Sequence, residues 1–155
     1  MLTAEEVLKQ KDRDIISIDP DSTVAEALDI MLKNNIGAIL IKDGEEFLGI
    51  WTERDLMKDV VTEGFYSKTS KIKDYMSTNL HAEPSTDSIY QLMDKCVGRK
   101  HRHLLIQKNG KIIGILSAGD ISRAQLMEKS KELDDLNKMV KWDYYEDWKW
   151  KKKKK

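Results

Sequence analysis

One seven-residue pattern occurs twice in this chain of 155 residues and limits the possible folds more than any other feature. Gly-Ile-Trp-Thr-Glu-Arg-Asp at 49–55 is followed, sixty-five positions later, by Gly-Ile-Leu-Ser-Ala-Gly-Asp at 114–120. Each copy places a hydroxyl residue at the end of a short apolar run and a carboxylate three residues later. A pattern that recurs at a fixed distance indicates that one structural unit is duplicated.

Each hydroxyl–carboxylate pair allows two interpretations. Ser or Thr at a helix N-cap, with an acid at the third helical position, forms a capping box that satisfies backbone N–H groups without a helical partner. A carboxylate also has enough acceptor lone pairs for the two neighbouring hydroxyls of a ribose, and Ser or Thr adds a donor or acceptor. Thr52 with Asp55, and Ser117 with Asp120, are candidates for both roles, which are compatible.

The composition favours one globular unit in the cytoplasm. A hydrophobic content of 40% with 35% charged residues is typical of such chains. No apolar run approaches the roughly 20 residues of a membrane span, and the first residues lack the basic and apolar segments of a secretory signal. The balance of 27 basic and 27 acidic residues argues against a general nucleic-acid binder.

The residue types give little support for catalysis. Cys96 lies at an apolar position of a helical pattern, which favours a small buried side chain. His81, His101 and His103 with this one cysteine lack zinc-site spacing, and the glycines do not form a Walker-type phosphate loop. We therefore expect no metal, no catalytic cofactor and no enzyme.

The first half alternates between strand and helix patterns. A short helix over 3–10 is expected to lead into a β-branched strand at 15–18, which ends at Asp19-Pro20. Apolar residues at helical spacing follow Thr23 and Glu26 and predict a capped helix up to Asn34-Asn35. An apolar strand at 36–41 and an Asp-Gly turn lead to the motif strand at 47–51.

The second half repeats this order with strands at 80–84, 102–106 and 111–116 and a helix that begins at Ser88. Pro20 and Pro84 lie 64 positions apart and the later landmarks 65, which predicts a one-residue insertion before the second helix. Ile72 to Met76 is expected to pack as the opening helix of the second unit. We predict an α/β fold of two strand-helix-strand-strand-helix repeats, at 5–66 and 67–127, with small mixed sheets and flanking helices.

With these elements in order, residues 5–127 resemble a tandem pair of CBS (cystathionine beta-synthase) domains, or Bateman module, of the stand-alone bacterial type. The resemblance is carried by the paired prolines, the strands at 36–41 and 102–106, and both Gly-apolar-x-Thr/Ser-x-x-Asp motifs. It implies a homodimeric regulatory module that binds adenine nucleotide between its repeats and acts on an unidentified effector protein in trans. AMP is the first ligand expected, with ATP, ADP and NAD as alternatives.

The resemblance also implies roles for single residues. Thr52 and Asp55 would hold one ribose, and Ser117 and Asp120 the other. The adenine would lie against two strands, with Ile16 and Ile18 on one side of the pseudo-two-fold axis and Leu80 and Ala82 on the other.

The basic residues predict that the two clefts differ. Arg102 and His103 stand where the first repeat has Gly37 and Ala38, whereas Arg54 stands where the second has Gly119. Because a phosphate needs donors and the guanidinium fork suits it, we expect the cleft of Ser117 and Asp120 to bind more tightly. Its phosphate would contact Arg102, His103 and, across the axis, Arg54. The alternative for each of these residues is a solvated surface charge.

The last segment, 128–155, is predicted to be a helical extension with an aromatic and lysine-rich tail. The helix after Asp120 should run to about Val140 with an apolar stripe, which would pack on the module or form a dimer seam. The tail contains Trp142, Trp148 and Trp150 and ends in five lysines. Two other functions stay open: a ligand-free dimeric scaffold, and attachment through this tail to an anionic surface.

Overall fold

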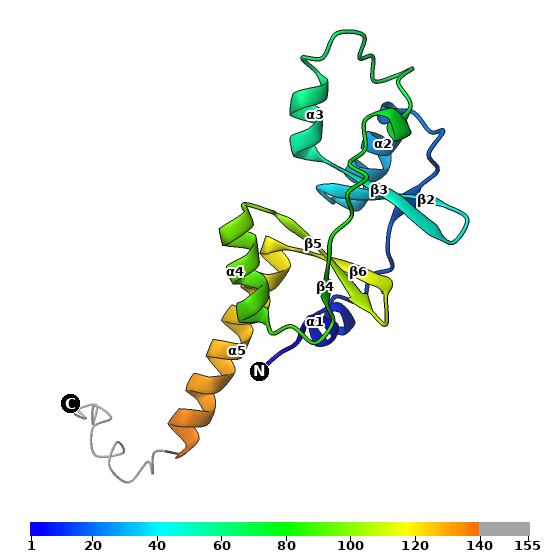
Figure 1. Cartoon of the computed structure of the whole chain (residues 1–155). Coiled ribbons are helices and arrows are strands. Elements are labelled where there is room, and N and C mark those ends of the chain that lie inside the picture. The colour runs from blue at the N-terminus through cyan, green and yellow to red at the C-terminus, as the bar shows by residue number, and fades with distance from the viewer. Residues whose placement is uncertain (140–155) are drawn as a thin grey trace, which may run out of the picture.

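The two halves of the chain fold into two three-stranded sheets of the same topology (Figure 1). In each sheet a short first strand pairs in parallel with the second, which forms an antiparallel hairpin with the third. The strands are β1 (Ser17–Ile18), β2 (Ala38–Asp43), β3 (Glu46–Thr52), β4 (Ala82–Pro84), β5 (His103–Lys108) and β6 (Lys111–Ser117). The computed structural model describes residues 1–139, so the tail at 140–155 lies outside the described residues.

Helices flank both sheets and begin where the sequence places capping residues. They are α1 (Ala4–Lys11), α2 (Val24–Asn34), α3 (Glu53–Asp59), the 3-10 helix η1 (Ile72–Asp74), α4 (Ile89–Arg99) and α5 (Ala118–Met139). Thr3, Thr23, Thr52 and Ser88 each form a complete capping box at the start of α1, α2, α3 and α4. The predicted α/β fold of two strand-helix-strand-strand-helix repeats is confirmed.

The strand register corrects the alignment of the two repeats. Ser17 pairs with Leu40, and Ala82 pairs with Leu105 in the equivalent parallel ladder. Both partners are therefore 65 residues apart, as are the N-caps of α2 and α4, so the predicted one-residue insertion does not exist. The error came from treating Pro20 and Pro84 as equivalent. The true equivalent of Ile18 is Glu83, and both side chains are buried.

The helix that precedes each repeat packs on the other half. Ala4 and Val7 of α1 are buried in the core of the second sheet, beside Ile89 and Leu116. Ile72 of η1 is fully buried in the core of the first sheet. The expectation that 72–76 packs as the opening helix of the second repeat is therefore wrong, because the two segments are exchanged between the halves.

The glycine that opens each motif permits this exchange. A Cβ atom at Gly49 would lie 2.5 Å from Met76 Sδ and 2.8 Å from the backbone oxygen of Ser77. A Cβ atom at Gly114 would lie 2.5 Å from a methyl carbon of Leu8. In both halves the exchanged segment thus crosses the third strand at the residue that has no side chain. The residues before β1 and at the start of β2 line one cavity together with residues of the second half.

Only the first part of α5 belongs to the core. Ile121 and Ala124 are buried, whereas Leu126, Leu133, Leu136 and Met139 are all more than half exposed. The helix extends away from the second sheet (Figure 1). Within the described residues the apolar stripe on the last part of α5 therefore does not pack on the module.

Candidate functional site

A cavity of about 160 Å³ opens where the two halves meet. One wall is apolar and consists of Ile15 and Ile16 before β1 and Ile36 before β2. Ser117, Asp120 and His103 line the space from the second half, and the other polar residues of the lining are Lys11, Arg13, Asp14 and Asn35. The structure therefore brings Ser117, Asp120, His103 and Ile16, which the sequence proposed as ligand contacts, into one cleft.

Asp120 lies in the first turn of α5 and is held at the cleft by hydrogen bonds at the helix N-terminus. The backbone N–H of Ser117 donates to Asp120 Oδ2 over 2.8 Å, and the N–H of Asp120 donates to Ser117 Oγ over 3.0 Å. Burial alone would raise the pKa of Asp120, but hydrogen bonds from Lys11 and from the Ser117 backbone outweigh it and lower the pKa below its usual range. Asp120 is therefore a carboxylate at neutral pH, with lone pairs facing the cavity.

Lys11, which the sequence analysis did not single out, completes this site. Its ammonium donates to Asp120 Oδ2 over 2.8 Å and to the backbone oxygen of Ile115 over 3.1 Å. It reaches Asp120, 109 positions away, because α1 packs on the second half of the chain. In the sequence, Lys11 follows directly after the helix predicted over 3–10. Its proximity to Asp120 could not be predicted from that position, because it depends on the packing of α1 on the second half.

The first motif has the same cap but lies outside this cavity. Asp55 Oδ2 accepts hydrogen bonds from the backbone N–H and the hydroxyl of Thr52, at 2.9 and 3.1 Å. Met76 packs against Gly49 as Leu8 packs against Gly114 in the second half, and Ser77 forms a bridge with Ile50. Neither Thr52 nor Asp55 lines the cavity at Asp120. The capping role of the carboxylate is thus present in both motifs, and the open cleft accompanies the second.

The remaining candidate residues lie outside this cavity. Arg54 crosses between the halves, as expected, but its guanidinium donates to the backbone oxygen of Lys100 over 3.2 Å. The side chain of Arg102 is exposed and does not line the cleft. Ile18 lies in the first core, Leu80 precedes β4 and Ala82 begins it, and none of the three lines the cavity.

His103 is the basic residue of β5 that does reach the cleft. Burial lowers its pKa below the usual histidine value, and the nearby Glu53 carboxylate opposes this shift only in part. At neutral pH the imidazole is therefore uncharged and provides one donor and one acceptor.

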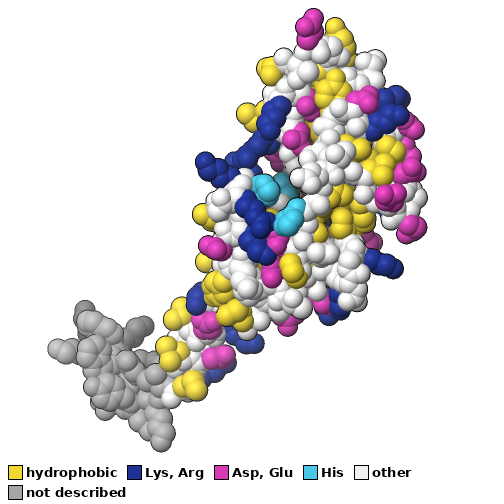
Figure 2. Space-filling model, viewed as in Figure 1, with side chains coloured by type: hydrophobic (Ala, Val, Ile, Leu, Met, Phe, Trp, Pro, Cys, Tyr) yellow, Lys and Arg dark blue, Asp and Glu magenta, His cyan; other side chains and the backbone are white. Residues whose placement is uncertain are grey.

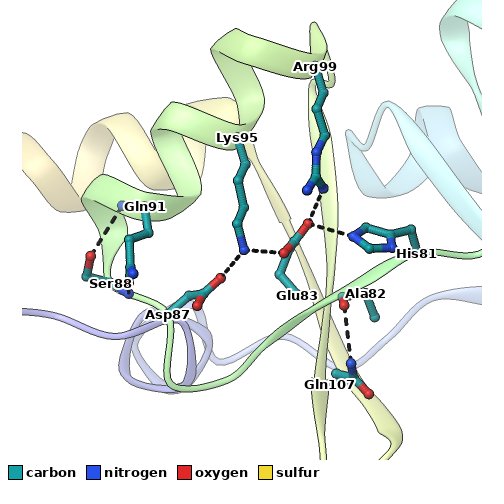
Figure 3. A network of polar contacts seen from close by, with 9 residues as sticks. All are labelled: His81, Ala82, Glu83, Asp87, Ser88, Gln91, Lys95, Arg99 and Gln107. Carbon is teal, nitrogen blue, oxygen red and sulfur yellow. Dashed lines mark hydrogen bonds and ion pairs between the residues drawn. The ribbon is translucent and has the colours of Figure 1, made fainter.

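Glu83 forms a second polar cluster, which sequence reasoning also missed. The side chain is 3% exposed and accepts hydrogen bonds from Lys95 and Arg99 of α4, while His81 Nε2 lies 3.1 Å away (Figure 3). Lys95 also contacts Asp87 at 2.5 Å. In the first half the equivalent position is Ile18, so this charge cluster makes the two halves chemically different.

The surface shows the same asymmetry. Histidine and basic side chains gather on one face where the two halves meet (Figure 2). Among residues 1–139 no group of histidine, cysteine, aspartate and glutamate is arranged to hold a metal ion. The same residues contain no helix with the length and apolarity needed to cross a bilayer.

Comparison with known sequences decides the family. The family model of the CBS domain matches residues 4–62 and again 72–127. The chain belongs to the CBS-domain family. The two CBS repeats defined by the duplicated motif are thus each matched by the family pattern.

Related CBS proteins cover most of the chain. The mitochondrial CBS domain-containing protein CBSX3 of Arabidopsis thaliana is 31% identical over 152 residues, which span 92% of this chain and 73% of that protein. The crystal structure of the CBS-domain containing protein ATU1752 from Agrobacterium tumefaciens has a TM-score of 0.74 at 32% identity, over 80% of this chain and 99% of that one. The CBS domain pair of protein MJ0100, solved with 5′-methylthioadenosine and S-adenosyl-L-methionine, has a TM-score of 0.69 at 19% identity, over 83% of this chain and 97% of that one.

Proposed function

We propose that the cleft at Ser117 and Asp120 binds an adenosine-containing ligand, with AMP as the first candidate, and that the bound state regulates an effector protein in trans. The observation that carries this proposal is an ionised, partly buried carboxylate that faces an apolar wall across a cavity. Asp120 would accept hydrogen bonds from the two ribose hydroxyls, and the adenine would lie against Ile16. The adenosine compounds bound to the CBS pair of MJ0100 support this ligand class.

The two CBS repeats are expected to contribute unequally. The cavity at the second motif contains Lys11, which is paired with Asp120, whereas Asp55 has no lysine or arginine partner among the described residues. An anionic ligand therefore meets an ammonium beside the second carboxylate but not beside the first. This difference supports one dominant site per chain. ATP, ADP and NAD remain alternatives to AMP because they share the ribose and the anionic phosphate.

The role is one of binding rather than catalysis. The polar groups around the cleft serve as hydrogen-bond partners, and the ligand would act by favouring the module shape that binds it better. We also propose that the module acts on a separate effector protein and that it is located in the cytoplasm.

A panel of ligands in a thermal-denaturation assay tests this function. A ligand at a hundredfold its dissociation constant adds about 2.7 kcal/mol to the free energy of unfolding. For a chain of this size that raises the melting temperature by roughly 5 to 10 °C. We expect such a rise with AMP or another adenine nucleotide and a much smaller one with guanosine nucleotides. No rise with any adenosine compound would exclude the proposed function.

The exposed apolar residues support a homodimer of the module. Leu32 on α2 and Val97 on α4 occupy equivalent helix positions 65 residues apart and are 79% and 70% exposed. Val61 and Leu126 form a second equivalent pair, 84% and 73% exposed. An apolar surface that is duplicated with the repeats suits a two-fold symmetric partner, for which a second copy is the simplest choice.

Light scattering during size-exclusion chromatography measures this assembly. We expect a mass of twice the 18.0 kDa chain, and the mass of one chain for the double variant Leu32→Glu, Val97→Glu. Leu136→Glu on the projecting end of α5 is the matched control and should remain dimeric. If Leu136→Glu alone gives the monomer, the dimer forms through α5 instead.

A further inference from the structure

Lys11 holds a position in the cleft that a ribose would have to share. Its ammonium and the Ser117 N–H both donate to the same carboxylate oxygen, Asp120 Oδ2, at 2.8 Å each. The other oxygen, Oδ1, lies 4.0 Å from the exposed Arg123 guanidinium. Lys11 and the Ser117 N–H use both lone pairs of Oδ2, so a ribose that places one hydroxyl on each carboxylate oxygen competes with Lys11 for Oδ2.

Displacement of Lys11 has an electrostatic cost. The side chain is 23% exposed and its partner Asp120 is 16% exposed, so both charges are largely removed from water. An ammonium that loses its carboxylate in such a place is destabilised unless another anion replaces it. His103 does not compete for that anion as a cation, because burial lowers the pKa of its imidazole. Arg13 also lines the cavity, but its side chain is exposed and forms no ion pair with Asp120, so it does not lose a counter-ion when a ribose binds.

The ligand itself can supply the replacing anion. A lysine side chain has four rotatable methylene groups, so its ammonium can move from the ribose end of a nucleotide towards the phosphate on the same sugar. Lys11 is the last residue of α1 and is followed by Asp12 in a left-handed conformation, where the helix ends. The backbone of α1 can therefore stay packed on the core while the side chain moves.

The other half of the molecule provides an internal comparison. There Met76 packs against Gly49 as Leu8 packs against Gly114, so an apolar contact holds the exchanged segment in both halves. Ala4 and Val7 of α1 are likewise buried in the second core, whereas the Lys11 ammonium contacts the Asp120 carboxylate and the backbone oxygen of Ile115. A neutral side chain at position 11 therefore leaves the apolar packing of α1 in place.

We propose that Lys11 is a specificity-determining residue, which makes the cleft select phosphorylated adenosine ligands over uncharged or cationic ones. When the ribose takes Asp120, Lys11 transfers to the phosphate, so that neither charge is left unpaired. Adenosine displaces Lys11 from Asp120 but provides no anion to replace the carboxylate. The positively charged sulfonium of S-adenosylmethionine repels the Lys11 ammonium. This inference rests on the proposed adenosine-binding function and adds the charge of the ligand to it.

Calorimetric titration of the full chain with AMP and with adenosine tests the proposal. The unaltered chain should bind AMP at least about tenfold more tightly than adenosine, as expected for one charge-assisted hydrogen bond. Lys11→Met should weaken AMP, bind adenosine as well or better, and so reduce the preference by about tenfold. Lys11→Arg should retain the preference for AMP over adenosine. Lys9→Met changes an exposed lysine of the same helix, 73% exposed, and should leave both affinities unchanged.

The outcomes separate the two claims. A circular-dichroism melt of Lys11→Met establishes that the variant is folded, as we expect because the apolar contacts of α1 are unchanged. If the preference for AMP is equal in Lys11→Met and the unaltered chain, or if adenosine binds the unaltered chain as tightly as AMP, the role of Lys11 is wrong. If neither ligand binds the unaltered chain, the proposed function falls, and this inference with it.

Discussion

Asp120→Asn is expected to raise the dissociation constant for AMP by about a hundredfold, whereas Asp55→Asn should change it by less than about threefold. A hydrogen bond to a charged group contributes about 1.5 to 3 kcal/mol, and a hundredfold change corresponds to about 2.7 kcal/mol. Asp120 is the carboxylate that lines the cavity, and Asn cannot carry its charge or accept through both side-chain atoms. Calorimetry with each purified variant measures both constants.

Asp55→Asn is a matched control because both acids stand in the same capping arrangement. Asp55 accepts from the Thr52 N–H at 2.9 Å, and Asp120 accepts from the Ser117 N–H at 2.8 Å. Any cost that arises from the start of a helix is therefore shared by the two variants. Equal losses, or a larger loss for Asp55→Asn, would contradict the assignment of the dominant site to the second motif.

Glu83→Ala is expected to have the largest effect on stability, with a loss of about 2 to 4 kcal/mol in the free energy of unfolding. The change leaves Lys95 and Arg99 without their shared buried carboxylate, and the loss of one partner of a buried ion pair is strongly destabilising. We place the value below the fully buried case because these two side chains are 28% and 42% exposed. The melting temperature should fall by roughly 5 to 15 °C.

Chemical denaturation of Glu83→Ala and Glu132→Ala side by side measures this effect. Glu132 pairs with Lys129 at 3.0 Å on the exposed part of α5, where an ion pair contributes at most about 1 kcal/mol. Glu83→Ile copies the equivalent Ile18 and should recover part of the loss by filling the space. Glu83→Ala with a stability equal to that of Glu132→Ala would show that the buried cluster contributes nothing.

The pH dependence of the same variant has a defined sign. Burial raises the pKa of Glu83, but the hydrogen bonds of Lys95 and Arg99 outweigh burial and lower it below the ordinary glutamate value of 4.5. A depressed pKa means that the stabilising contribution is complete above the unfolded-state pKa and is lost as the pH falls through the folded-state pKa. The stability gap between the unaltered chain and Glu83→Ala should therefore be constant near neutrality and narrow below about pH 4.5.

Local patterns in the sequence predicted most of the fold because they depend on nearest neighbours along the chain. Capping residues such as Thr23 and Ser88 satisfy backbone groups three positions away, so the starts of the helices follow directly from the sequence. The alternation of strand and helix followed from the duplicated motif. The tandem α/β architecture was thus predictable before any long-range contact was known.

What the sequence did not reveal depends on long-range packing. The contact of Lys11 with Asp120 exists only because α1 crosses to the second half, and no local pattern predicts that exchange. The burial of Glu83 was not predicted, because aligning Pro20 with Pro84 shifts the strand before each proline by one residue from its true register. Arg102 was expected to contact the phosphate because of its position in the repeat. Its side chain is instead exposed and does not line the cleft.

The crystal structure of the full chain grown with saturating AMP tests the central claim most directly. The account predicts one nucleotide in the cleft between the halves, with both ribose hydroxyls within about 3 Å of the Asp120 carboxylate and the adenine against Ile16. It also predicts that Lys11 has left Asp120 for the phosphate. A vacant cleft at Asp120, or a nucleotide bound only beside Thr52 and Asp55, would contradict the account.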